Sequence, residues 1–365
     1  MATTAVPAIN LPSVPRGWNE LTWEQLTGVW NLLLAYPRGI EDAESYIRIY
    51  QFLAGVRFRI PSVDELPEGC EPGVTCVIER VGKSPETYFV DIRELQILLM
   101  GWHVEVEGVK EDREGLLEWV DKRQGLTRLP KEFIKIGRRK YFLPSPMMTS
   151  LTYQQYGNMQ KILQAFWQTE QMLLQHFKQA ESKQSDLESG FFSQSEKARL
   201  SKEIEAVYDR IKEGVKQQKD LRNRFLAHTL NGRRFRLTSH VNGGTNLSVG
   251  WVYAYNVEDA EAQTKYMDKV PDVVFRILLQ WFQSCMAYYK EQMPDLFSNE
   301  GGMDMRSPLM SEIDTVNSIM KWKGAYTTQQ EVYDTNAIFI FGDLKDMTRE
   351  AKEIEKAQSK VRRRK

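Results

Sequence analysis

The stretches LTWEQLTGVWNLLLAY (21–36) and LTYQQYGNMQKILQAF (151–166) decide our interpretation of the fold, because the second repeats the first. Aligned without gaps, they share Leu, Thr, Gln, Leu and Ala at the same offsets, and they exchange aromatic residues at two more. A second pair of related stretches follows, FLAGVRFRI (52–60) and FLAHTLNGRRFRL (225–237). Repeated helical units pack in tandem and build an extended surface. The repeat therefore favours a binding or assembly role over a single catalytic pocket.

The first half of the chain is predicted to mix helices with short strands. Residues 1–20 contain three prolines and are interpreted as an extended N-terminal arm. The stretch EVEGVKEDREG (104–114) is interpreted as an acidic, solvated connector. Apolar residues at three- and four-residue spacing predict helices, and short runs rich in β-branched and aromatic residues predict strands. The predicted helices cover 21–36, 41–54, 94–102 and 116–122, and the predicted strands cover 56–60, 75–81 and 87–92.

The second half is predicted to repeat this order around an inserted segment at about 180–220. This segment is polar and favours helix, so we predict a projecting helical hairpin whose tip holds Gly190, Phe191 and Phe192. Two adjacent exposed phenylalanines would form a docking point for a partner; the alternative is that both fold back onto the body. Two β-hairpins are also predicted, one turning near Gly137 and one at the Asn-Gly-Gly sequence of 242–244.

These patterns together predict a mainly α-helical fold with small β-hairpins, an α+β protein. It would contain two related helix-helix-hairpin-helix units and a C-terminal helical domain. The predicted boundaries are 1–20 for the arm, 21–146 for the first unit, 147–293 for the second unit, 294–308 for a linker and 309–365 for the C-terminal domain.

Composition narrows the class of protein. Lys and Arg total 49, as do Asp and Glu, so the formal net charge is zero and the basic excess of a generic polyanion binder is missing. Three cysteines at irregular spacing favour a reducing compartment without a disulfide framework. The sequence shows neither a signal peptide nor an apolar run long enough for a membrane span. We therefore expect a cytoplasmic protein with no membrane partner.

A search for catalytic motifs finds none. The chain lacks a phosphate-binding loop, a dinucleotide-binding GxGxxG and a GxSxG nucleophile elbow. His103 and Glu105 match the first half of a zinc deaminase signature, but the required P-C-x-x-C is missing. The four histidines lack neighbours at metal-ligand spacing. We predict no enzyme activity, no catalytic residue, no metal site and no cofactor, with an enzyme of unfamiliar class as the alternative.

Basic residues cluster at 138–140, 233–236 and 362–365. Such clusters contact phosphates in nucleic-acid-binding proteins. They also protect strand edges and keep proteins soluble, and the neutral total favours this second interpretation. Nucleic acid is therefore an unfavoured partner.

Three features resemble the tail-assembly chaperones among bacteriophage morphogenesis proteins. The first is the start of an aromatic-rich helix, Leu151–Gln155, after the hairpin sequence FIKIGRRKYFLP and the prolines of YFLPSP. The second is the closing segment SIMKWKGAYTTQQEVYDTNAIFIFGDLKDMTREA. The third is the neutral, helical composition without catalytic motifs. The resemblance covers about half of the chain; the chain's length and its 180–220 insertion depart from that family.

The resemblance implies a non-enzymatic tail-assembly chaperone in the host cytoplasm. Such a protein binds apolar helical segments of a tape-measure or tail-tube protein. The alternatives are a permanent virion subunit of the neck or connector, which would pack against copies of itself, and a nucleic-acid-associated factor. The candidate partner-binding residues are Trp23, Trp30, Tyr153, Phe166, Phe191 and Phe192.

Overall fold

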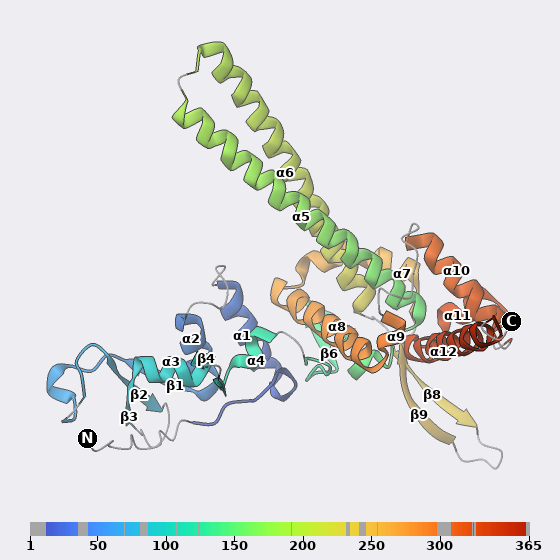
Figure 1. Ribbon diagram of the computed structural model, residues 1–365, viewed down its shortest axis with the longest axis horizontal. Coiled ribbons are helices and arrows are strands. Elements are labelled where there is room, and N and C mark those ends of the chain that lie inside the picture. The colour runs from blue at the N-terminus through green and yellow to red at the C-terminus, as the bar shows by residue number, and fades with distance from the viewer. Residues whose placement is uncertain are drawn as a thin grey trace. The chain divides into compact units, whose positions relative to one another are not determined.

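The chain folds into helices with small antiparallel sheets, as the computed structural model in Figure 1 shows. The predicted mainly helical class with small β-hairpins is thereby confirmed. The chain divides into unit 1, Met1–Pro130 with Asp272–Tyr288, and unit 2, Lys131–Pro271 with Tyr289–Lys365. The structure describes residues 12–35, 43–68, 70–80, 87–106, 109–122, 125–190, 192–230, 234–240, 246–253, 255–297, 308–322, 324 and 326–362.

Unit 1 combines short helices with two small sheets. The first sheet is antiparallel in the order β1-β2-β3, which confirms the three predicted strands. The helices are η1 (Trp18–Glu20), α1 (Trp23–Ala35), α2 (Ala43–Ala54), η2 (Val63–Glu65), α3 (Ile92–Met100), α4 (Glu118–Lys122) and the greater part of α8 (Asp272–Gln292). The strands are β1 (Val56–Arg59), β2 (Thr75–Arg80), β3 (Thr87–Asp91), β4 (Gly101–Val106) and β5 (Val109–Glu114).

Tryptophans from distant parts of the sequence form the core of unit 1. Trp281 is fully buried, and the ring of Trp18 stacks on that of Trp30 with 6.2 Å between centroids. The indole N–H groups of Trp30 and Trp18 are satisfied, since Trp30 Nε1 donates to Gln280 Oε1 at 2.8 Å and Trp18 Nε1 donates to the carbonyl of Trp119 at 2.9 Å. Buried indole N–H groups normally find such acceptors.

The predicted acidic connector at 104–114 is wrong, because these residues belong to the β4–β5 hairpin. Its strands pair Glu105 with Lys110 and His103 with Asp112 in antiparallel register. The charged residues of this stretch therefore belong to paired strands and not to a loop.

Unit 2 is dominated by the two longest helices, α5 (Tyr153–Ser189) and α6 (Gln194–Thr229). Both predicted β-hairpins are confirmed, as β6–β7 and β8–β9. The strands are β6 (Phe133–Ile136), β7 (Arg139–Phe142), β8 (Arg234–His240) and β9 (Asn246–Tyr253). The remaining helices are η3 (Pro146–Met148), α7 (Val257–Gln263), η4 (Thr264–Lys269), α9 (Pro294–Phe297), α10 (Pro308–Lys321), α11 (Gln329–Asp334) and α12 (Ala337–Arg362).

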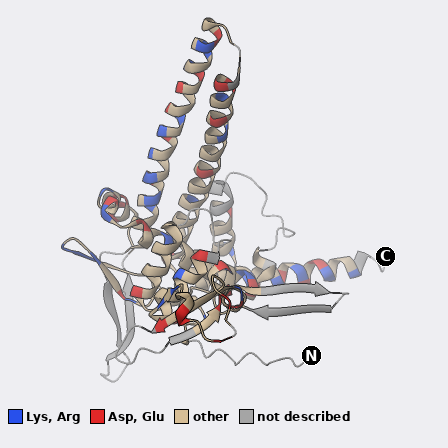
Figure 2. Cartoon of the chain, turned by 90° about the vertical axis from the view of Figure 1, so that its left-hand side faces the viewer, with Lys and Arg blue, Asp and Glu red and all other residues tan. Residues whose placement is uncertain are grey.

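The start of α12 is fixed to the start of α5 inside unit 2. The amide of Tyr153 donates to the carbonyl of Thr335 at 2.8 Å, and the amide of Ala337 donates to the carbonyl of Leu151 at 3.0 Å. Phe341 is buried one turn further along α12. By contrast, residues 351–360 of α12 are exposed, and both signs of charge lie along this part of the helix (Figure 2).

Parts of the predicted arm and linker lie outside the described residues. In the predicted arm, residues 1–11 are not described, and the carbonyl of Pro12 accepts a hydrogen bond from the hydroxyl of Tyr50 at 3.1 Å. In the predicted linker 294–308, the short helix α9 is described and residues 298–307 are not.

Candidate functional site

Helices α5 and α6 form a long antiparallel hairpin, drawn in green at the top of Figure 1. A helical hairpin that turns near Gly190 is confirmed, but its helices extend well beyond the predicted insertion at about 180–220. Thr152 caps α5, because its hydroxyl accepts from the amide of Gln155 at 3.1 Å. Ser193 and Glu196 form a reciprocal capping box at the start of α6. These caps set where each helix begins, and a short turn between them reverses the chain.

A narrow apolar seam holds the outer part of the hairpin together. Leu173 and Ala180 from α5 pack with Val207 and Ile211 from α6, and all four are buried. Gly214 allows α6 to approach, because a Cβ atom there would lie 2.7 Å from Cδ2 of Leu173. The seam is only one row of side chains wide on each helix, so both of its flanks face outward.

Four apolar side chains beside this seam remain exposed. The exposed fractions are 50% for Leu174, 50% for Phe177, 46% for Tyr208 and 48% for Val215. Successive residues of an α-helix are about 100° apart around its axis. On this basis each of the four side chains lies roughly 50–110° around its helix from the seam, counted in the direction of increasing residue number. Because the helices are antiparallel, an equal sense of rotation places all four on one side of the hairpin. We call these four residues the apolar flank.

An ion pair on the other side of the hairpin supports this placement. Around their helices, Lys183 and Glu203 lie on the other side of the seam from the apolar flank. Lys183 Nζ is 2.5 Å from Glu203 Oε2. The same calculation puts Met172, which is 47% exposed, on that second side. Each helix therefore has a polar side with an ion pair and a side that carries the apolar flank.

The four residues of the apolar flank also lie at similar heights, meaning positions along the long axis of the hairpin. The Leu173–Gly214 and Lys183–Glu203 contacts fix the register of the two helices. Tyr208 then lies near the height of Gln179 and Val215 near that of Met172, so the side chains of Phe177 and Leu174 fall between them. The apolar flank is one compact patch about 10 Å long, given a rise of about 1.5 Å per residue. Compact exposed apolar patches mark interaction sites on proteins.

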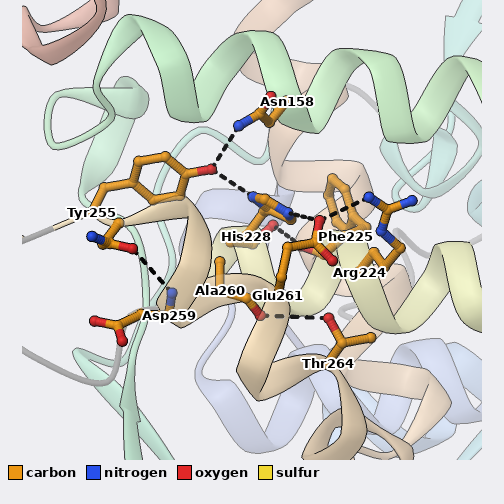
Figure 3. Close-up of polar contacts among 11 residues, drawn as sticks. Asn158, Arg224, Phe225, His228, Tyr255, Asp259, Ala260, Glu261 and Thr264 are labelled. Carbon is orange, nitrogen blue, oxygen red and sulfur yellow. Dashed lines mark hydrogen bonds and ion pairs between the residues drawn. The ribbon is translucent and has the colours of Figure 1, made fainter. Parts of the chain in front are cut away.

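A polar network centred on the buried side chain of His228 fixes the base of the hairpin (Figure 3). The hydroxyl of Tyr255 lies 2.5 Å from Nδ1 of His228 and 2.9 Å from Nδ2 of Asn158. On the other side of the ring, Nε2 of His228 lies 3.1 Å from Oε1 of Glu261, which also accepts from Arg224 at 2.8 Å. The network thus joins α5, α6 and α7 within unit 2.

The donors and acceptors of this network are mutually consistent. Asn158 can only donate through its amide nitrogen, so the hydroxyl of Tyr255 accepts that bond and is free to donate to Nδ1 of His228. The His228 proton then belongs on Nε2, where it is donated to Glu261. Both ring nitrogens are occupied, which suits a residue that positions helices. Sequence spacing missed this network because its members come from separate segments.

The environment shifts the pKa values of these groups in different directions. Burial lowers the pKa of His228, although the bond to Glu261 opposes this effect. The hydrogen bond from Arg224 lowers the pKa of Glu261, and burial raises the pKa of Tyr255 to about 12. At neutral pH the imidazole is therefore neutral and the carboxylate is charged.

We expect unit 2 to lose stability as the pH falls below the ordinary histidine pKa of 6.5. The folded-state pKa of His228 is below that value, so the unfolded chain binds the proton first and unfolding becomes more favourable. The slope reaches at most about 1.4 kcal/mol per pH unit from this residue. Urea unfolding followed by circular dichroism at pH 7.5, 6.5 and 5.5 measures it. A His228→Gln variant should show a flatter profile; an equal slope in both proteins would contradict the assignment.

Three of the aromatic residues predicted to bind a partner are part of the core. Trp30, Tyr153 and Phe166 are 6%, 9% and 3% exposed. Trp30 donates to Gln280 in unit 1, and the ring of Tyr153 stacks on Tyr333 in unit 2 with 6.5 Å between centroids. A partner could reach these rings only if the surrounding core opened, so they form no part of the candidate surface.

The other predicted residues have different surroundings. Trp23 is half-buried on α1. Phe192 is 37% exposed at the hairpin tip, and its ring covers Gly190, where a Cβ atom would overlap it. Phe191 lies outside the described residues. Phe192 is therefore partly exposed at the tip, as the first of the two predicted arrangements requires of it.

In the part of the chain that the structure describes, no group of three or more His, Cys, Asp and Glu side chains is placed to hold a metal ion. Among the same residues, every helix is too short or too polar to cross a bilayer. In one basic cluster, the guanidinium of Arg139 lies 4.1 Å from the centroid of the Tyr266 ring. This cation therefore has a partner within unit 2.

Comparison with known proteins adds no relative: no family model matches the chain, and neither the curated proteins nor the solved structures contain a match.

Proposed function

We propose that this protein is a non-enzymatic assembly factor that binds protein chains through its α5–α6 hairpin. The observation that carries the proposal is the apolar flank, four half-exposed side chains on a long helical arm. Helices with a free apolar stripe bind by packing against helices of a partner. The polar network around His228 supports this role, because it fixes the base of the hairpin to α7.

The resemblance to tail-assembly chaperones extends this proposal to bacteriophage morphogenesis. In that setting the protein acts in the host cytoplasm and binds apolar helical segments of a tape-measure or tail-tube protein.

A permanent virion subunit is the second candidate function. The charges along the hairpin favour it, because the charged residues beside the apolar flank are acidic on α5 and basic on α6. A surface with one sign of charge on each half suits packing between identical subunits. Binding to nucleic acid remains a lesser alternative.

Co-expression with the genes that neighbour this one tests the proposal, with tape-measure or tail-tube proteins as the expected partners. We expect affinity purification of this protein to recover one of them. Phe177→Ser should reduce that recovery at least tenfold, because it removes an apolar side chain from the flank. Met172→Ser is the matched control, since Met172 is equally exposed on the other side of the hairpin.

Analysis of finished particles separates the two candidate functions. Recovery of the complex together with absence from particles supports the chaperone. A fixed number of copies in each particle supports the virion subunit. Absence from both the complex and the particles would overturn the proposed role in assembly.

A further inference from the structure

The residues of the apolar flank share their helix faces with charged residues, which are acidic on α5 and basic on α6. Within about 50–120° of the seam, the α5 side of the hairpin carries only acidic charged residues and the α6 side only basic ones. The two rows follow the same rotational sense as the flank, so they border it on the same side. The acidic row is Glu170, Glu181 and Glu188, and the basic row is Lys197, Lys212 and Lys219.

Two of the three charge pairs match in height when two hairpins are set side by side in the same direction, whereas Lys212 lies about 9 Å from the height of Glu181. By the register of the hairpin, Lys197 lies within about 3 Å of the height of Glu188, and Lys219 within about 3 Å of that of Glu170. The apolar flank occupies the height between the two pairs. A complementary surface would place basic residues opposite the acidic row, acidic residues opposite the basic row, and apolar residues opposite the flank.

A second copy of this chain presents that surface. A two-fold axis parallel to the hairpin places α5 of one copy against α6 of the other, so acidic rows face basic rows. A two-fold axis perpendicular to the hairpin would instead set α5 against α5 and α6 against α6, which opposes like charges along both rows. Like-charge contacts across an interface disfavour a pairing. Only the first arrangement is complementary in both charge and apolar contact.

We propose that the apolar flank is covered by a second copy of this chain, with the two hairpins parallel and forming a four-helix bundle. The inference rests on the second candidate function proposed above, packing between identical subunits, and it names the surface that those subunits bury. Leu174 and Phe177 of one copy pack on Tyr208 and Val215 of the other. Two-fold contacts of this kind are the commonest form of protein self-association.

Sedimentation equilibrium of the full chain at 1–100 µM tests the apolar contact. We expect a dimer in wild type and a dissociation constant at least tenfold weaker in Phe177→Ser. Met172→Ser should match wild type, because its side chain lies on the other side of the hairpin. Far-ultraviolet circular dichroism confirms that both variants remain folded, which is expected because both positions are about half exposed.

A charge exchange at the hairpin tip tests the orientation. Glu188→Lys and Lys197→Glu each place two like-charge contacts in the parallel dimer, so each should weaken it several-fold at low salt. An equal mixture of the two variants restores opposite charges at both contacts and should form a heterodimer with the wild-type affinity. Lys197 is chosen because Lys219 also pairs with Asp268 in its own chain, at 3.2 Å.

The outcomes separate this inference from the proposed function. A monomer at every concentration, or a dimer that Phe177→Ser leaves unchanged, would overturn the inference. So would a mixture of the charge variants that associates no better than each alone. If the monomer still captures a tape-measure or tube protein through the flank, the proposed function stands without the dimer. If the dimer forms but no structural protein or particle contains it, the inference stands and the assembly role fails.

Discussion

Gly115→Ala should lower the free energy of unfolding of unit 1 by about 2–3 kcal/mol. A Cβ atom at Gly115 would overlap the backbone of residues 99–101, where α3 ends and β4 begins. Backbone atoms cannot rotate away as a flexible side chain can. The flanking amides also hold the two segments together, since Leu116 donates to the carbonyl of Leu98 and Leu117 to that of Leu99, both at 2.9 Å. Any shift that makes room for the methyl group lengthens these bonds.

Hydrogen-exchange mass spectrometry with urea unfolding measures this effect locally. Peptides covering α3 and α4 should exchange faster in Gly115→Ala, while peptides from α5 and α6 should not. Gly17→Ala is the matched control in unit 1, because no atom lies within 4 Å of a Cβ there and its backbone is extended. Equal destabilisation by the two substitutions would show that the close approach at Gly115 is not tight.

The sequence contained the signals for most helices but not for every strand. Apolar spacing located α1 and α2, and the glycine at 137, with a φ of +60°, marked the turn between β6 and β7. The β4–β5 hairpin was missed because its charges concealed a period of two residues. Val104 and Val106 alternate with His103 and Glu105, and the strand register makes that alternation a signal for a strand.

The candidate surface could be predicted only in part, for a reason of geometry. Leu173 in the seam and Leu174 on the flank are neighbours in sequence, and both belong to apolar stripes with three- and four-residue spacing. Spacing identifies the stripes but does not show which one α6 covers. That depends on the pairing of two helices joined through a distant turn. The same ambiguity applies to Phe166, a candidate partner-binding residue. Its aromatic side chain would suit either a buried seam or an exposed surface, and in the structure it is buried.

Phe341→Ala should cost unit 2 about 3–5 kcal/mol and release the start of α12 from α5. Phe341 is 2% exposed, and its ring meets three others edge-on. The ring centroids of Tyr156, Tyr289 and Phe297 lie 4.9, 5.7 and 5.8 Å away. Removing the ring leaves a cavity and forfeits these contacts, which add to the loss of apolar burial.

Phe339→Ala provides a control in the same helix, because the same ring is lost from a position that is 70% exposed. It should change the free energy of unfolding by less than about 0.5 kcal/mol. Hydrogen exchange at the amides of Tyr153 and Ala337 reports the release directly, since these amides donate the backbone bonds that join the start of α5 to the start of α12. If Phe341→Ala leaves their protection unchanged, those backbone bonds hold the two helices without the aromatic cluster. If protection falls in Phe341→Ala alone, burial of this one ring is what makes α12 part of unit 2, and the exposed residues 351–360 project from an anchored helix.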